Sequence, residues 1–159
     1  MKTRLFIFSM CLLLLIFCSC DAEASTASLD CGAVSKELVS EISGGEDYIE
    51  YDDVDVAYFP FASPDTEISM LYSRSADDIG EIGVLKTDSD KIDTLKKSVE
   101  EYLSNLKNEK AAFLRNYAPG ELSKLDDACV KRYGNYIVFA VLSYDESEKL
   151  FNKAEEILK

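Results

Sequence analysis

Residues 136–142, YIVFAVL, are apolar throughout and rich in β-branched and aromatic types. Because neighbouring side chains of a strand point to opposite faces of a sheet, this run predicts a central strand that is buried on both faces. It follows Gly134-Asn135, a two-residue connection of the kind that a type II′ turn accepts, and an earlier strand-like run over residues 128–133. The segment therefore predicts a hairpin whose second strand is central.

A helix is expected to close the chain after this hairpin. Asp145 and Glu148 form a capping-box-like pair at its start. Apolar residues then recur at helical spacing and should face inward: Leu150, Phe151, Ala154, Ile157 and Leu158. The predicted order is strand, strand, helix.

The same order of elements is expected earlier in the chain. Residues 68–73 and 79–86 are strand-like, and Gly83 within the second run suggests a bulge or a close backbone approach. A long helix is predicted from about residue 90 to residue 116, and Pro119 prevents its continuation. Its apolar stripe contains Ile92, Leu95, Val99, Tyr102, Leu103, Leu106, Phe113 and Tyr117, with Lys110 as an interruption.

Two shorter segments precede these units. Residues 33–43 place apolar side chains at every fourth position and end before Gly44-Gly45, which predicts a short amphipathic helix. Residues 46–64 mix acidic and aromatic side chains without a clean period. We expect a loop there, with one helical turn near residues 52–58 and aromatic side chains docked on the core.

Two strand-strand-helix units in succession predict the α+β class. We expect a four-stranded antiparallel sheet from these two units, with both helices on one face, and the short N-terminal helix packed where apolar surface is left open. The chain of 159 residues is long enough for one domain and too short for two. Its apolar fraction of 47% and charged fraction of 30% are those of a folded protein.

The first residues of the chain, MKTRLFIFSMCLLLLIFCSC, indicate export. Lys2 and Arg4 give a positive start, and residues 5–18 are apolar except for Ser9. A bilayer span needs about 20 apolar residues, so this run is too short for one and has the usual length of a signal-peptide core. A cleaved signal is therefore predicted.

The end of this segment resembles the bacterial lipobox. Small residues, Cys18 and Ser19, precede Cys20, and Phe17 stands where leucine is usual. The resemblance implies that Cys20 becomes the lipid-modified N-terminus of the mature protein. A soluble secretory signal cut near Ala22 or Ala24 is the alternative.

These signals predict the organisation of the chain and its location. Residues 1–19 would be a lipoprotein signal peptide, residues 20–32 a lipid anchor and flexible tether, and residues 33–159 a single globular extracytoplasmic domain on the outer face of the cell membrane. The formal net charge is -13, and the predicted signal contains basic residues but no acidic ones. Such a charge repels nucleic acid and anionic lipid heads, so we expect no nucleic-acid partner and attachment through acyl chains.

Cys31 and Cys129 are the cysteines outside the predicted signal and anchor. An exported protein can join them in a disulfide. Burial of each thiol among apolar side chains is the alternative. The sequence leaves both open.

Three short stretches resemble those of a known family. They are residues 81–86 (EIGVLK), residues 116–119 (NYAP) and residues 134–138 (GNYIV). In this order they are similar to small Gram-positive lipoproteins with the domain of unknown function 4358, over about residues 68–158. The family has no established activity to transfer, and the resemblance implies a lipoprotein.

Composition excludes several kinds of chemistry. The chain has no histidine, which removes the commonest general base and the nitrogen ligands of zinc sites. Its seven glycines form no complete phosphate-binding loop, and two cysteines cannot complete a thiolate zinc site. We expect no enzymatic activity, no cofactor and no metal.

Carboxylates are the abundant reactive groups and suggest two alternatives. Glu81 with a loop acid such as Asp78 would suit a glycan hydrolase if their carboxyl groups stood about 5 Å apart. The acidic segment 46–55 offers oxygen ligands for a calcium-dependent binding domain, but it lacks the spacing and the glycine turn of a hand-type loop. A solvated acidic loop is the simpler interpretation of that segment.

Aromatic residues in the irregular segment suggest a contact surface. Tyr48, Tyr51 and Tyr58 suit contacts with protein or glycan, although docking on the core is the alternative. We expect a lipid-anchored, non-enzymatic binding or envelope-associated module. Its partners would be membrane lipid through Cys20 and an envelope protein or glycan.

Overall fold

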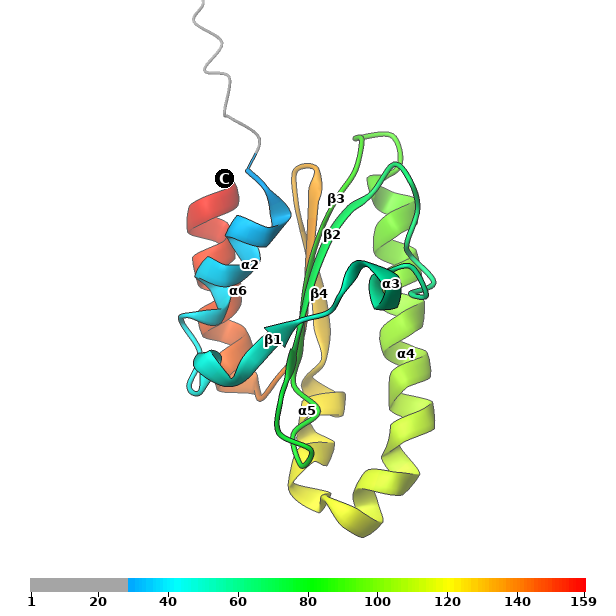
Figure 1. Ribbon diagram of the computed structural model, residues 1–159, viewed down its shortest axis with the longest axis vertical. Helices are drawn as coiled ribbons and strands as arrows, with labels where there is room; N and C mark the ends of the chain where they lie inside the picture. The colour runs from blue at the N-terminus through cyan, green and yellow to red at the C-terminus, as the bar shows by residue number, and fades with distance from the viewer. Residues whose placement is uncertain (1–28) are drawn as a thin grey trace, which may run out of the picture.

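Five antiparallel strands form one sheet in the computed structural model, which describes residues 29–159 (Figure 1). The strand order is β1-β2-β3-β5-β4. The strands are β1 Tyr48–Glu50, β2 Glu67–Ser73, β3 Glu81–Lys86, β4 Cys129–Tyr133 and β5 Tyr136–Val141. The helices are α2 Cys31–Val39, α3 Asp53–Val56, α4 Ile92–Tyr117, α5 Leu122–Asp127 and α6 Tyr144–Leu158, with short 3-10 turns η1 Gly45–Asp47 and η2 Pro119–Glu121.

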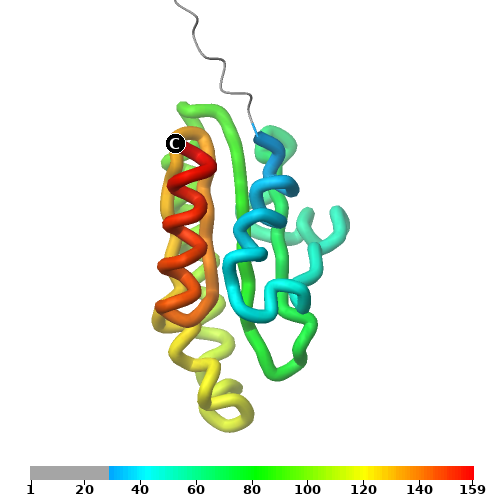
Figure 2. The backbone as a smooth tube through the Cα atoms, turned by 90° about the vertical axis from the view of Figure 1, so that its left-hand side faces the viewer, coloured from blue at the N-terminus to red at the C-terminus, as the bar shows by residue number. Residues whose placement is uncertain are grey.

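Helices cover both faces of the sheet. Figure 1 shows α2 and α6 on one side of the strands and α4 on the other, and Figure 2 shows α2 and α6 side by side. Each face has its own apolar core. The α2/α6 core includes Leu38 and Leu150, and the α4 core includes Ile92 and Phe139.

The predicted α+β class is confirmed, but the strand count and the placement of the helices were wrong. A short fifth strand, β1, pairs with β2 inside the segment predicted as a loop. Alternate residues of β3 enter different cores: Ile82 and Val84 face α2 and α6, whereas Leu85 faces α4. Because a sheet that is apolar on both faces must be covered on both, the helices of the two units lie on opposite sides.

The hairpin of β4 and β5 agrees with the prediction. Gly134 has φ 57°, and within the described range only glycines have a positive φ, so Asn135 does not. A positive φ at the first turn residue alone is the pattern of a type II′ turn. Strand β5 lies between β3 and β4, as its apolar sequence predicted.

The start of the fold differs slightly from the prediction. Helix α2 begins at Cys31 rather than residue 33, because the side chain of Asp30 accepts a hydrogen bond from the backbone N–H of Ala33. Its predicted core residues, Val34, Leu38 and Ile42, are buried. The predicted signal and Cys20 lie outside the described residues. None of the described helices has the length and apolar character needed to span a membrane.

The far end of α4 departs from its predicted stripe. Ile92, Leu95, Val99 and Leu103 are buried as expected, but Phe113 is 57% exposed and Tyr117 is 75% exposed. Their rings stack on each other, and Leu114 is the buried residue of these turns. Helix α4 packs on α5 as well as on the sheet, and Leu114 shares the α4 core with Leu125 of α5.

Helix α6 begins differently from the prediction. The hydroxyl of Ser143 donates a 2.6 Å hydrogen bond to Oε2 of Glu146, so the Ser-x-x-Glu pair starts one residue before the helix. Asp145 and Glu148 form no such pair among the described contacts. The inward positions Leu150, Phe151 and Ala154 are buried as predicted.

Both described cysteines are free thiols, with Cys31 buried and Cys129 partly exposed. Burial, and then the nearby Glu67, raise the pKa of the Cys31 thiol, which makes it slow to react.

Iodoacetamide at pH 8 should therefore label Cys129 before Cys31, as measured by peptide mass spectrometry. Recovery of a peptide pair joined through these two residues would contradict the free-thiol state.

Candidate functional site

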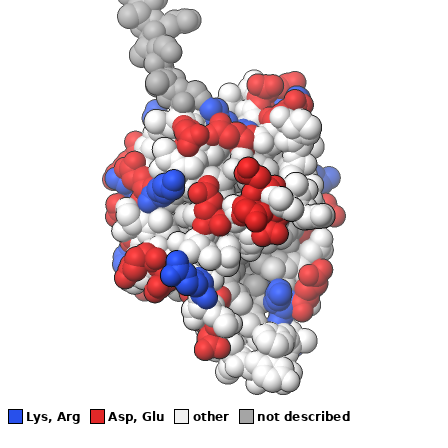
Figure 3. Space-filling model, viewed as in Figure 1, with Lys and Arg blue, Asp and Glu red and all other residues white. Residues whose placement is uncertain are grey.

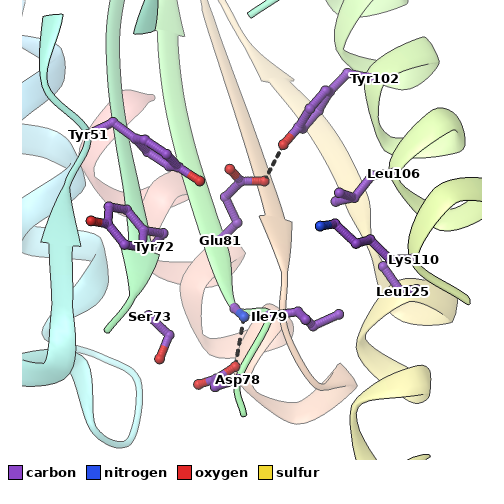
Figure 4. Close-up of a pocket in the computed structure, with 11 residues that line it drawn as sticks. Tyr51, Tyr72, Ser73, Asp78, Ile79, Glu81, Tyr102, Leu106, Lys110 and Leu125 are labelled. Carbon is purple, nitrogen blue, oxygen red and sulfur yellow. Dashed lines mark hydrogen bonds between the residues drawn. The ribbon is translucent and has the colours of Figure 1, made fainter. Parts of the chain in front are cut away.

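A pocket of about 200 Å³ lies at the start of β3, between the sheet and α4. The polar residues that line it come from five parts of the chain: Tyr51 after β1, Tyr72 and Ser73 on β2, Asp78 in the loop between β2 and β3, Glu81 on β3, and Tyr102 and Lys110 on α4 (Figure 4). We call this the Glu81 pocket. The sheet therefore supplies its floor, and α4 supplies one wall.

Glu81 is the buried acid of this pocket. It pairs with Tyr72 of β2 and Val141 of β5, and its alternation with Ile82 directs its side chain to the α4 face. The residue is only 5% exposed. Its Oε2 accepts a 2.7 Å hydrogen bond from the hydroxyl of Tyr102, whereas its Oε1 has no hydrogen-bond partner.

Tyr51 approaches the same carboxyl group from the opposite wall. Its hydroxyl points toward Glu81 in Figure 4 and is near enough to affect the pKa of Glu81. The structure has no hydrogen bond between the two groups, and Oε1 of Glu81 has no partner among the described residues. One oxygen of a buried carboxyl group in the lining of the pocket therefore lacks a donor.

Burial determines the ionisation of these groups. It raises the pKa of Glu81, and the hydroxyls of Tyr102 and Tyr51 and the charge of Lys110 oppose this shift without cancelling it. Burial, followed by the charge of Glu81, also raises the pKa values of Tyr51 and Tyr102. Both hydroxyls therefore stay protonated and can donate hydrogen bonds.

The aromatic walls are held by other rings. Tyr51 lies 4.4 Å from Tyr72 and 5.3 Å from Phe59 between ring centroids. Tyr102 lies 5.9 Å from Phe139, which is fully buried in β5. Because each ring packs against a neighbour, the tyrosines are fixed around the pocket before any ligand enters.

An ion-pair network closes the other end of the pocket. Oδ1 of Asp78 accepts hydrogen bonds from Nζ of Lys124 at 2.6 Å and from the backbone N–H of Gly80 at 2.7 Å. Lys124 also pairs with Glu121 at 2.9 Å. Burial alone would raise the pKa of Asp78, but the bonds from Lys124 and Gly80 outweigh it and lower the pKa. The network fixes the loop before β3 to α5.

Replacing Glu81 with glutamine should stabilise the protein at high pH. Because the folded-state pKa of Glu81 is raised, its contribution to stability is present below its unfolded pKa and is lost as the pH rises through the folded pKa. Glutamine does not titrate. Urea unfolding should therefore show that the free energy of unfolding of E81Q rises relative to that of the wild type from pH 4 to pH 8. Asp78 is present in both proteins, so its opposite pH dependence cancels in the comparison. A difference that stays constant with pH would contradict the raised pKa.

The structure brings together the two predicted acids but not the three predicted tyrosines. Glu81 and Asp78 line one pocket. Tyr48 packs with the α2/α6 core, Tyr51 lines the Glu81 pocket on the opposite face, and Tyr58 is 83% exposed. They form no common surface. Tyr48 and Tyr51 are partly buried against the core, which is the predicted alternative to a contact surface.

The acidic segment uses its carboxylates locally. Asp52 accepts a 2.8 Å hydrogen bond from the backbone N–H of Asp55 and so caps α3, which confirms the predicted helical turn. Glu50 accepts a 3.2 Å hydrogen bond from Ser69. Across residues 29–159, no three cysteine or carboxylate side chains converge as metal ligands would. Acidic side chains are instead spread over the face seen in Figure 3.

Three residues of the site were not recognised from the sequence. The sequence pattern places Tyr72 in a strand, Tyr102 in an apolar stripe and Lys110 at an interruption of that stripe, yet all three line the pocket. A signal was present: a tyrosine on a buried stripe needs a partner for its hydroxyl. Glu81, at the start of an apolar strand, was the available acceptor.

Comparison with known proteins identifies the family and nothing more specific. No curated protein and no solved structure matches the chain. The family model described as a domain of unknown function (DUF4358) matches residues 58–142, more than half of the chain. This region contains Glu81, Tyr102 and Lys110, while Tyr51 precedes it. The chain therefore belongs to the family of the domain of unknown function DUF4358.

Proposed function

We propose that this protein is a lipid-anchored, extracytoplasmic module that binds a small ligand in the Glu81 pocket without chemical conversion. One observation carries the binding proposal: Glu81 lines the pocket, and its buried oxygen Oε1 has no hydrogen-bond partner. An unpaired buried polar atom costs about 1–3 kcal/mol. A ligand that supplies a donor would remove this cost.

The pocket has further properties of a binding site. It is concave, and its walls include the rings of Tyr51, Tyr72 and Tyr102 beside the carboxyl group of Glu81. Small-molecule sites commonly combine such aromatic walls with a few convergent polar groups. The packing of these rings on neighbouring rings supports a site that is formed before the ligand arrives.

A ligand screen tests the binding proposal. Thermal unfolding of the full chain in a nonionic detergent would be measured with amines, polyols, saccharides and small carboxylates. We expect one class to raise the melting temperature of the wild type. Leu106 lines the pocket, so Leu106→Phe should fill it and abolish the rise. No rise with any class, or an equal rise in L106F, would contradict the proposal.

The lipid anchor is supported by the sequence before Cys20. The short apolar run and the small residues at positions 18 and 19 are typical of a lipoprotein signal. The net charge of -13 would keep the protein away from anionic lipid heads. Acyl chains on Cys20, each contributing about 0.8 kcal/mol per buried methylene, would overcome this repulsion.

Replacing Cys20 with alanine should move the protein out of the membrane fraction. We expect the wild type in that fraction, with an N-terminal peptide that begins at Cys20 and carries the mass of its acyl chains. Cys18→Ala is the matched control, because it removes a cysteine but keeps a small residue before the cleavage site. Wild-type protein free in the culture fluid, or with residues 1–19 still attached, would contradict the anchor.

A carboxylate hydrolase is the second candidate, and one observation favours it. Glu81 and Asp78 line the same pocket, and their pKa values are shifted in opposite directions, as in an acid and base pair. Binding is favoured because Oδ1 of Asp78 is already engaged by Lys124 and Gly80. Incubation with cell-wall polysaccharide should yield no products. Products that disappear in both E81Q and D78N would establish the hydrolase instead.

A further inference from the structure

We infer that the group recognised by the Glu81 pocket is a protonated amine of a small organic cation. The inference rests on the proposed binding function and adds the chemical class of the ligand. Three features of the pocket support it: the unpaired oxygen of Glu81, the tyrosine walls, and the balance of charge around them.

The first feature is the carboxyl group itself. Tyr102 donates to Oε2, and Oε1 is buried in the lining of the pocket without a hydrogen-bond partner. A neutral hydroxyl could occupy that position as a donor, but it would leave a buried carboxylate without an opposite charge. An ammonium group supplies both the N–H donor and the charge, and hydrogen bonds between two charged groups are the stronger kind.

The second feature is the set of aromatic walls. The rings of Tyr51, Tyr72 and Tyr102 line the pocket around the carboxyl group. Aromatic faces attract cations through their quadrupoles, and rings that surround a cation are a common means of binding amines. A ligand anion would face these rings and Glu81 together, which disfavours it.

The third feature is the charge of the groups that face Glu81. Tyr51, Tyr72 and Tyr102 are neutral, and the charge of Asp78 is balanced by Lys124. The remaining cation of the lining is Lys110, which is exposed and forms no ion pair with any residue from 29 to 159. Its long side chain makes it a competitor for the position of a bound amine rather than a fixed partner of Glu81.

Calorimetry with propylammonium tests the inference. Propanol is the neutral probe of similar shape, and the full chain is used in a nonionic detergent at pH 8. We expect propylammonium to bind at least about tenfold more tightly than propanol, since a hydrogen bond between charged groups contributes at least this factor. E81Q should lose this preference. Lys110→Met, which removes the competing cation, should bind propylammonium more tightly than the wild type.

Controls separate the site from the overall charge. Glu148→Gln removes one negative charge from an exposed position on α6, across the sheet from the pocket, and should leave binding unchanged. Equal losses in E148Q and E81Q would overturn the inference, as would weaker binding in K110M. Because the carboxylate is the binding form, binding should also strengthen as the pH rises through the titration of Glu81.

The outcomes distinguish the inference from the proposed function. Propanol or glucose binding as tightly as propylammonium, with loss in L106F, would overturn the amine and retain the binding site. A screen in which no class of compound binds would overturn both. Preference for propylammonium in the wild type tests the ligand class even without any variant, so it does not depend on how a substitution folds.

Discussion

Replacing Phe139 with alanine should lower the free energy of unfolding by about 3–5 kcal/mol. Phe139 is fully buried in β5 and belongs to the core under α4. Its ring contacts Phe61 and Tyr102 at centroid distances of 6.0 and 5.9 Å. Alanine would leave a cavity among these rings, because the sheet backbone cannot close around it. Urea unfolding at pH 7 measures the loss.

Phe113→Ala is the matched control for this substitution. It removes the same atoms from a ring that is 57% exposed and stacks on Tyr117. We expect a change of at most about 0.5–1 kcal/mol, as for other surface positions. Equal losses in F139A and F113A would contradict the assignment of Phe139 to the core.

Replacing Gly83 with alanine should lower the free energy of unfolding by about 1–3 kcal/mol through overpacking. Gly83 pairs with Phe139 across β3 and β5, and a Cβ atom at this position would lie 2.7 Å from Cδ1 and Cζ of that ring. The pairing on both sides of Gly83 is regular. Of the two predicted alternatives, the close approach is therefore confirmed and the bulge is wrong.

Gly120→Ala is the matched control for G83A. A Cβ atom there meets nothing within 4 Å, so we expect a change within about 0.5 kcal/mol. A second arm combines G83A with Phe139→Leu, because the smaller side chain leaves space for the new methyl group. The loss in the double variant should be less than the sum of the single losses. Additive losses would contradict a direct clash between the two residues.

These two core residues also position the candidate site. The ring of Phe139 lies over Gly83 and against Tyr102, and Tyr102 donates to Glu81. Glu81 is two residues before Gly83 on the same face of β3. A glycine that admits a large ring therefore sets the position of the tyrosine that holds the buried acid.

The strands and most of the helices were predictable because local patterns determine them. The apolar run over residues 136–142, the Gly134-Asn135 turn and the stop at Pro119 each lie near the observed boundaries. Buried positions such as Leu38, Val99 and Leu150 followed from helical spacing. These features depend on neighbours in the sequence.

The features that could not be predicted depend on packing between distant segments. Strand β1 has three residues and is held by its pairing with β2. At the end of α4, Leu114 packs in one core with Leu125 of α5, whereas Phe113 and Tyr117 are exposed. The placement of helices on both faces, by contrast, could have been predicted, because residues 136–142 are apolar on both sides of the strand.

The candidate site was predictable only as a pair of acids. Glu81 and Asp78 do line one pocket, but no local pattern places Tyr102 against Glu81 or Lys124 against Asp78. These partners are 21 and 46 residues away in the chain. Only the antiparallel sheet with α4 packed on it brings them together.

The titration of Glu81, followed by the carbon-13 NMR signal of its carboxyl group, tests the central claim most directly. The signal would be assigned as the one that is missing in E81Q. We predict a midpoint above the ordinary glutamate pKa of 4.5, because the group is buried with one oxygen unpaired. A midpoint at or below 4.5 would mean that the carboxyl group is solvated or already paired, and would contradict the binding site proposed around it.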